Sequence, residues 1–250
     1  MRCKQQVVQQ LKNGRYIIRP CGHCINCRIN DTRAWYVRSR FEIKKLERPF
    51  QYFLTLTYSD EYLPEDNVCS KIEAKKFLNC LNTSFGLKMR YFFTSDYGNV
   101  SGRAHYHAIL LSTEKITQKQ CERIWKKGFV YLKKLNTHNL KYCLRYTVKK
   151  APFDNTDKKS FRLISKGWGD NVKDYYTGQD YFIFDGKKYG VSPYLAQKIG
   201  LEKKNVDSYL DFGNMVRSSD YKKLVDNSYD SYIDDLVQQV RLRNSYKENI

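Results

Sequence analysis

Apolar and polar residues alternate with two different periods along the 250-residue chain, and these periods predict its secondary structure. Segments rich in aromatic and β-branched side chains are typical of strands, and they occur at residues 50–58, 89–94, 104–111 and 129–132. Apolar residues at helical spacing predict helices, at residues 31–46, 70–86, 117–128 and 138–150. Capping patterns at Ser70 and Thr117 mark two helix starts, and Pro49 and Pro152 end the two other helices.

Between residues 50 and 132 the elements follow the order β-α-β-β-α-β, which is the split βαβ pattern of ferredoxin-like and RRM-like sheets. We therefore predict an α+β fold in which an antiparallel sheet has two helices on one face and an open second face. Extra helices surround this core, which we assign to residues 49–152. Residues 1–48 form a Cys-rich leader and a basic helix, and residues 153–250 form a C-terminal hairpin, turning at Asp185-Gly186, and a helical extension.

The charge of the chain indicates a polyanionic partner. Its 45 Lys and Arg against 26 Asp and Glu give a net charge of +19, which favours nucleic acid through counterion release, although a basic surface also keeps a protein soluble. The 21 Tyr and 13 Phe can stack on bases. The chain shows no apolar leader and no membrane-length segment, so we expect a cytosolic protein with no membrane partner. Its eight cysteines are then thiols or metal ligands.

Two of the four histidines, His105 and His107, lie two residues apart in a predicted strand. Residues i and i+2 of a strand point to the same face, so both imidazoles can bind one Mg²⁺ or Mn²⁺ together with a carboxylate and waters. Asp96, at the end of the neighbouring strand, is the carboxylate in range. The alternative is a pair of half-buried histidines without a ligand.

Tyr142 and Tyr146 lie one turn apart on a predicted helix, outside its apolar stripe and on the same side as Lys149. This placement indicates phenols that are presented to a ligand. A phenolate can attack a phosphodiester in line and form a 5′-phosphotyrosine with a free 3′-hydroxyl, and a metal stabilises the developing charge. Two tyrosines would allow a second transfer. Aromatic residues are frequent here, so the spacing alone also fits chance.

The leader contains Cys21, Cys24 and Cys27 at metal-ligand spacing, and Cys3 can supply a fourth thiolate to a structural Zn²⁺. His23 is a less suitable ligand because cysteines flank it on both sides. The alternative is a set of reduced, buried cysteines without a metal. The remaining cysteines are interpreted as packing residues: Cys69, Cys80, Cys121 and Cys143.

Three segments in this order resemble the motifs of the HUH (His-hydrophobe-His) endonucleases: Phe53-Leu-Thr-Leu-Thr-Tyr58, Gly102-Arg-Ala-His-Tyr-His-Ala-Ile-Leu110 and Tyr142-Cys-Leu-Arg-Tyr-Thr-Val-Lys149. Within that superfamily the chain is similar to the rolling-circle replication initiators of Microviridae phages, of the gokushovirus type. The leader Pro20-Cys-Gly-His-Cys-Ile-Asn-Cys-Arg28, followed by Trp35, Arg38 and Glu42, adds to the likeness. The resemblance covers about residues 1–152.

The resemblance implies that His105 and His107 are metal ligands and that both tyrosines are nucleophiles. The family usually has a lysine after the first tyrosine, where this chain has Arg145, whereas Tyr146 keeps Lys149. Arginine does not give up a proton, so we rank Tyr146 above Tyr142 as the first nucleophile. The third ligand is usually a glutamate before Tyr-Gly, and Asp96, one methylene shorter, stands there.

We therefore expect an enzyme that nicks and rejoins a single-stranded DNA origin and starts rolling-circle replication of a phage genome in the host bacterial cytoplasm. Its expected partners are a host helicase and the replication machinery. Basic residues are the candidate DNA contacts: Arg33, Arg38, Arg103, Arg145 and Lys150. A tyrosine transposase or plasmid relaxase would use the same chemistry. A non-catalytic, zinc-containing nucleic-acid-binding protein would explain the charge and the cysteines, but not the histidine pair together with the tyrosines.

Overall fold

The computed structural model describes residues 3, 5–10, 16–45, 47–98, 102–145 and 160–201. These residues fall into two compact units, one ending at Ile29 and one formed by residues 30–201. The first unit contains the antiparallel hairpin of β1 (Val7–Gln10) and β2 (Tyr16–Arg19), which was not predicted. Helix α1 (Ile25–Ile43) begins in the first unit and runs on into the second.

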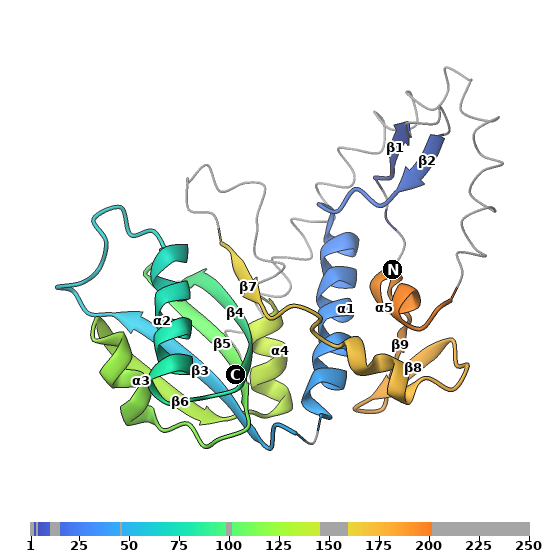
Figure 1. Cartoon of the computed structure of the whole chain (residues 1–250). Coiled ribbons are helices and arrows are strands. Elements are labelled where there is room, and N and C mark those ends of the chain that lie inside the picture. Colours follow the sequence, from blue (N-terminus) through green and yellow to red (C-terminus); the bar gives the residue numbers. More distant parts are fainter. Residues whose placement is uncertain are drawn as a thin grey trace. The chain divides into compact units, whose positions relative to one another are not determined.

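The second unit is built on an antiparallel sheet of five strands, shown in Figure 1. The strands are β3 (Phe50–Tyr58), β4 (Met89–Tyr97), β5 (Ala104–Ser112), β6 (Gly128–Lys134) and β7 (Arg162–Ile164). Their order, β6-β3-β5-β4-β7, puts β5 at the centre. The first four strands have the predicted ferredoxin-like arrangement, so the α+β fold class is confirmed. Strand β7 extends this sheet at the β4 edge.

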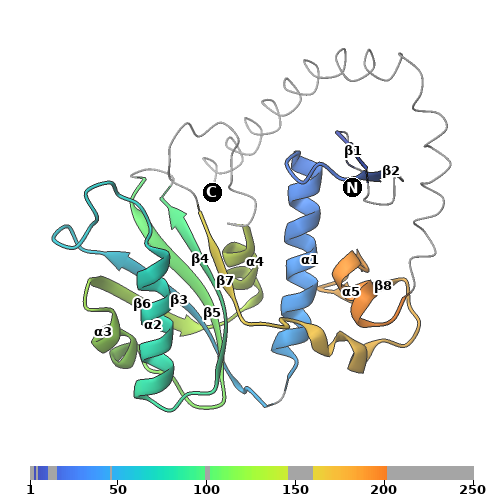
Figure 2. The same ribbon diagram turned by 45° about the horizontal axis from the view of Figure 1, so that its top comes forward.

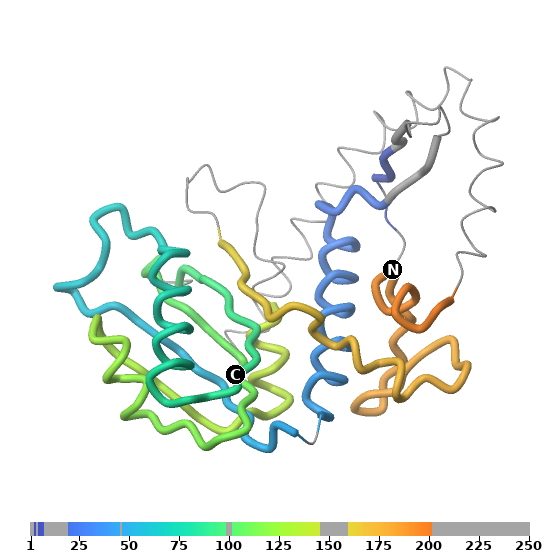
Figure 3. The backbone as a smooth tube through the Cα atoms, viewed as in Figure 1, coloured from blue at the N-terminus to red at the C-terminus, as the bar shows by residue number. Residues whose placement is uncertain are grey.

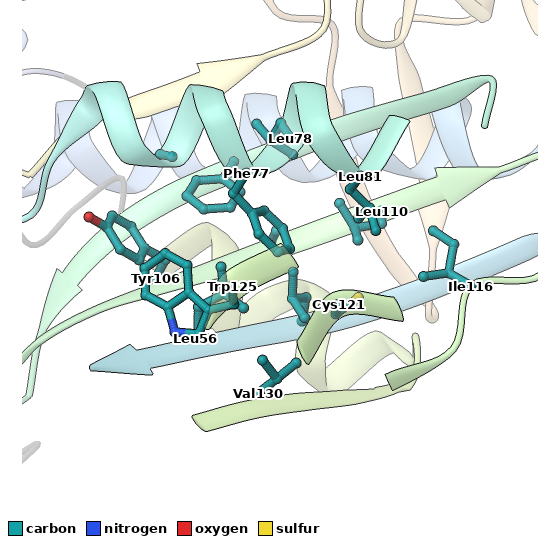
Figure 4. Packing of buried hydrophobic residues seen from close by; sticks show 14 of the residues in the cluster. Leu56, Phe77, Leu78, Leu81, Tyr106, Leu110, Ile116, Cys121, Trp125 and Val130 are labelled. Atoms are coloured by element: carbon teal, nitrogen blue, oxygen red, sulfur yellow. The ribbon is translucent and has the colours of Figure 1, made fainter. Parts of the chain in front are cut away.

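One face of the sheet packs against α2 (Lys71–Ser84) and α3 (Gln118–Trp125). Figure 4 shows Leu56, Tyr106 and Leu110 from the strands against Phe77 and Leu81 of α2. Ser70 caps α2 through the Glu73 backbone N–H, and Thr117 forms a reciprocal capping box with Gln120 at α3, as predicted. The Glu73 carboxylate accepts hydrogen bonds from Tyr58 and Lys127.

The prediction of an open second face is wrong, because helices cover much of it. Phe53, Phe92, Ile109 and Leu111 point to this face and form a core with α1 and with α4 (Thr137–Arg145). Figure 2 shows α1 and α4 on the side of the sheet opposite α2 and α3. Because β5 reads Ala-Ile-Leu-Leu at residues 108–111, both of its faces are apolar there, which is the pattern of a strand that is buried on both sides.

The chain then forms a C-terminal module, from η1 (Asp170–Tyr175) through the hairpin of β8 (Tyr181–Phe184) and β9 (Lys187–Gly190) to α5 (Pro193–Lys198). Figure 3 traces this path from β7 onward. The predicted hairpin is confirmed, with Asp185 and Gly186 at positive φ in its turn. One further difference concerns α1, which begins at Ile25 instead of residue 31 and so contains Cys27.

Contact between this module and α1 requires a close backbone approach. The Trp168 side chain is fully buried, and its Nε1 donates to Ser39 Oγ at 3.0 Å. Gly169 has φ +79°, and a Cβ there would lie 2.6 Å from the Arg38 carbonyl oxygen, so only glycine fits. The buried Glu42 carboxylate accepts the Gly169 N–H at 2.7 Å and pairs with Arg90 of β4. The module, α1 and the sheet therefore form one packed structure.

Some predicted segments lie outside the described residues: the last turn of the helix predicted at 138–150 and the helices of the final fifty residues. None of the helices described is long and apolar enough to span a membrane.

Replacing the buried indole tests how far the C-terminal module stabilises the sheet domain. We expect Trp168→Ala to lower the free energy of unfolding by about 3–5 kcal/mol, because it leaves a large cavity beside Phe92 and removes the hydrogen bond to Ser39. Urea denaturation followed by circular dichroism measures the change. Ile183→Ala, at a side chain that is 60% exposed in the same module, is the control and should change it by no more than about 0.5 kcal/mol. Equal effects of the two variants would contradict the assignment.

Candidate functional site

The pairing of β4 with β5 brings the three predicted metal ligands together. His105 and His107 share one face of β5, and Asp96 of β4 stands directly opposite His105. Asp96 Oδ2 lies 3.2 Å from His105 Nε2, and one ligand atom from each of the three residues lies within 4.8 Å of the others. Asp96 and His107 are buried and His105 is partly exposed. These residues are arranged so that they can bind a metal.

Hydrogen bonds at the far ring nitrogens orient both imidazoles. His105 Nδ1 lies 2.8 Å from the Arg103 carbonyl oxygen, which can only accept, so Nδ1 carries the proton and Nε2 keeps its lone pair. His107 Nδ1 lies 3.0 Å from the Thr55 hydroxyl on β3, and when that oxygen accepts, Nε2 of His107 is likewise the ligand atom. Such bonds to the outer nitrogen are usual for metal-binding histidines.

The donor set and its spacing fit a small divalent cation. An octahedral ion with bonds of ~2.1 Å holds adjacent ligand atoms about 3.0 Å apart, close to the 3.2 Å between Asp96 and His105. Two neutral imidazoles and one carboxylate suit a transition-type ion such as Mn²⁺ and are also compatible with Mg²⁺.

Helix α4 places Tyr142 beside this triad. Leu140, Cys143 and Leu144 are buried, whereas the Tyr142 side chain is 37% exposed, as its position outside the apolar stripe predicted. The Tyr142 ring centroid lies 5.2 Å from that of His107 and 6.1 Å from that of Phe53. Arg145 is exposed at the end of the helix. Tyr146, Lys149 and Lys150 lie outside the described residues.

A carboxylate in the C-terminal module holds α4 against α1. Asp185 accepts hydrogen bonds from Tyr36 (2.6 Å) and Arg40 (2.9 Å) of α1, and from Lys141 of α4 (3.0 Å). The bonds from Tyr36 and Lys141 are the main reason that the pKa of Asp185 is lowered to about 2. Lys141 precedes Tyr142, so this contact fixes the helix next to the residue that faces the histidines.

The four cysteines of the leader also converge, within the first unit. The Sγ of Cys3 lies 3.6 Å from that of Cys21 and 3.8 Å from that of Cys24, and the Sγ of Cys21 lies 3.9 Å from that of Cys27. A tetrahedral Zn²⁺ with Zn–S bonds of ~2.3 Å would hold its sulfur atoms about 3.8 Å apart. The cluster is thus able to bind a metal with this geometry.

Backbone N–H groups stabilise negative charge on these sulfur atoms. The N–H groups of Cys24 and His23 point at Cys21 Sγ, at 3.2 and 3.4 Å, and that of Cys21 points at Cys3 Sγ at 3.3 Å. Burial opposes ionisation of Cys24, but hydrogen bonds from the Cys27 backbone and the neighbouring thiols lower its pKa to about 6. Thiolates are the form that binds metal. Among the other cysteines, Cys69, Cys121 and Cys143 are buried as expected, whereas Cys80 is exposed.

The candidate DNA-contacting cations differ in their surroundings. Arg33 and Arg145 are exposed. The Arg38 guanidinium lies between the rings of Trp35 (3.9 Å) and Tyr194 (3.6 Å) and donates to the Trp168 carbonyl, so it connects parts of the protein. Arg103 donates to the Tyr58 carbonyl and pairs with Asp60.

Sequence reasoning missed two polar residues of this region, Thr55 and Asp185. Thr55 lies within the first motif, but only the register of β3 against β5 shows that it stands across from His107. Asp185 was identified only as a turn residue, since nothing local indicates its partners on α1 and α4.

Comparison with known proteins agrees with the site. Residues 51–151 match the family model of the ORF2-type replication-associated proteins. The chain is 27% identical to the replication-associated protein ORF2 of Spiroplasma virus 4, over 94% of this chain and 86% of the relative. It is 23% identical to the replication-associated protein VP4 of Bdellovibrio phage phiMH2K, over 90% and 80% of the two chains. Identity to the replication-associated protein ORF4 of Chlamydia phage 1 is also 23%, over 90% and 65%.

No solved structure matches the chain. The matches cover both the sheet domain, which holds Asp96, His105 and His107, and most of the remaining chain. They confirm the resemblance that the three motifs indicated: this chain is a relative of the replication-associated proteins of Microviridae phages.

Proposed function

We propose that this protein nicks and rejoins single-stranded DNA at a phage origin through a 5′-phosphotyrosine and so starts rolling-circle replication. The observation that carries the proposal is the triad of Asp96, His105 and His107 with a helix-borne tyrosine ring 5.2 Å from His107. The matched relatives are themselves replication-associated proteins of phages. The protein would work in the host bacterial cytoplasm, with a host helicase opening the duplex.

The reaction would be an in-line displacement at phosphorus. A divalent cation held by the triad, Mg²⁺ or Mn²⁺, would supply charge stabilisation to the scissile phosphate. The phenol of Tyr146 loses its proton and attacks phosphorus, the P–O3′ bond breaks, and the 3′ oxygen takes up a proton. Lys149 would stabilise the phenolate through its charge. Tyr142 would attack the same linkage in a second transfer and so rejoin a new strand end.

We assign the leader cysteines to a structural Zn²⁺. The support is the separation of their sulfur atoms and the N–H groups that point at them. Four protein ligands leave no open position for substrate, so this metal would stabilise the leader and take no part in the nicking reaction.

Two other functions use parts of the same structure. A tyrosine transposase or relaxase would share the triad and the tyrosines, and differs in the DNA sequence that it recognises. A non-catalytic nucleic-acid-binding protein would need neither the ordered imidazoles nor the tyrosine beside them. The bonds from Arg103 and Thr55 to the histidines favour the catalytic alternatives.

The first test looks for the covalent intermediate. Wild-type protein, incubated with labelled origin-containing single strands and Mn²⁺, should cleave the strand and retain the label on the protein in a denaturing gel. We expect Tyr146→Phe to reduce the initial adduct by about 1000-fold or more, because the nucleophile is lost, and Tyr142→Phe to spare it.

Tyr175→Phe, at an exposed tyrosine of η1, is the matched control and should behave as wild type. A wild type that forms no adduct would reject the catalytic proposal. An adduct that survives Tyr146→Phe and disappears in Tyr142→Phe would reverse the ranking of the two tyrosines.

The second test concerns Thr55 as a positioning residue for His107. Thr55→Val keeps the shape of the side chain and removes its hydrogen bond to Nδ1. We expect Mn²⁺ affinity to fall by about 10–100-fold, measured by electron paramagnetic resonance, with little change in urea stability without metal. Thr55→Ser should restore affinity. Equal Mn²⁺ binding by the wild type and the valine variant would contradict this role.

The third test concerns the leader. Purified wild-type protein should contain one zinc per chain by elemental analysis, and Cys27→Ser should lower this content because three thiolates remain. Cys80→Ser, at the exposed cysteine outside the cluster, should keep the full content. A wild type without bound zinc, or equal metal content in both variants, would count against the assignment.

A further inference from the structure

Strand β6 exposes two large aromatic side chains on the same face of the sheet as the histidine triad. Phe129 is 71% exposed and Tyr131 is 55% exposed, whereas Val130 between them points to the opposite face and is buried. A single exposed aromatic residue is common on protein surfaces. Two of them on one face of one strand need another explanation, because the neighbouring positions of this face carry Phe53 and Ile109 in a packed core.

The strand register aligns these two rings with the histidines. Phe129 pairs with Thr57, which pairs with His105, and Tyr131 pairs with Thr55, which pairs with His107. Neighbouring strands lie ~4.8 Å apart, so the rings stand about 10 Å from the histidines across β3. This is about the length of three stacked nucleotides, at ~3.4 Å each. A strand that reaches the triad can therefore extend over β6.

A row of aromatic rings and a cation connect the two places. The Lys133 ammonium lies 5.2 Å from the centroid of the Tyr131 ring and 5.7 Å from that of Phe53. Phe53 in turn contacts Tyr142 and stacks on His107 at 5.5 Å. The Cα atoms of residues i and i+2 on a strand are about 6.8 Å apart, twice the ~3.4 Å stacking distance, so one base fits between the two exposed rings.

We infer that Phe129 and Tyr131 form a stacking platform for the bases of a single-stranded DNA substrate, with Lys133 contacting its phosphates. This inference rests on the proposed function for the identity of the substrate. Aromatic faces with a nearby cation suit unpaired bases and phosphate, because stacking needs a free base face. In a duplex, the base faces are already stacked on one another. The platform would hold the strand next to the triad without reading its sequence.

Binding and cleavage can be tested separately. The probe is a fluorescein-labelled oligodeoxythymidine of about twelve nucleotides, followed by anisotropy without added divalent metal. We expect Phe129→Ala and Tyr131→Ala each to weaken binding about tenfold, and the double variant about 100-fold, since a stacked base contributes about 1–3 kcal/mol. Phe129→Trp should bind as wild type, whereas Phe129→Leu should bind as the alanine variant, because stacking needs a ring.

Tyr181 is the matched control. It is 40% exposed on β8, and Lys188 lies 4.4 Å from its ring centroid, as Lys133 does for Tyr131 at a similar distance. Tyr181→Ala should leave affinity unchanged. Wild-type affinity in both Phe129→Ala and Tyr131→Ala would overturn the inference, as would equal competition by an abasic oligonucleotide or by a duplex of the same length.

The two proposals fail in different experiments. If the alanine variants lose binding while the wild type forms no covalent adduct, the platform stands and the nicking function is rejected. If the variants bind and form the adduct as wild type does, the platform is rejected and the nicking function stands.

Discussion

The alternation of side chains along β5 is the constraint on which the rest of the structure depends. This strand lies at the centre of the sheet, paired along its length with β3 and β4. Its even positions, Tyr106 among them, support the core under α2 and α3, and its odd positions carry both histidines. A shift of one residue in its pairing would exchange the two sets. The packing of the apolar core therefore also fixes the imidazoles opposite Asp96.

The second face of the sheet is divided between packing and chemistry. At one end Ile109 and Leu111 lie under α1 and α4, and at the other end the histidines remain next to a partly exposed tyrosine. Covering only half of a face removes part of the water around the triad and leaves an approach to it. Electrostatic interactions are stronger where water is excluded, so a metal held there would act on a phosphate more strongly than one on an open sheet.

Local patterns in the sequence were sufficient to predict the strands and the ligand set. Strand β3 has the predicted bounds, and His105 and His107 share a face because side chains alternate along every strand. Contacts between distant segments could not be predicted. Asp185 lies 149 residues from Tyr36 and 44 from Lys141, and no local pattern connects them. Tyr146, the favoured nucleophile, lies outside the described residues, so its role stays a prediction.

The interactions of Asp185 and Trp168 have a practical consequence for anyone who prepares a shorter form of the protein. The sequence motifs end before residue 152, which invites an expression fragment that stops there. Such a fragment would lack the indole that fills the space beside Ser39 and the carboxylate that holds Lys141 of α4. It would keep every candidate ligand while losing the support of the tyrosine helix. A fragment that continues to Leu201 retains both, and it is the shorter form to use for crystallisation or NMR.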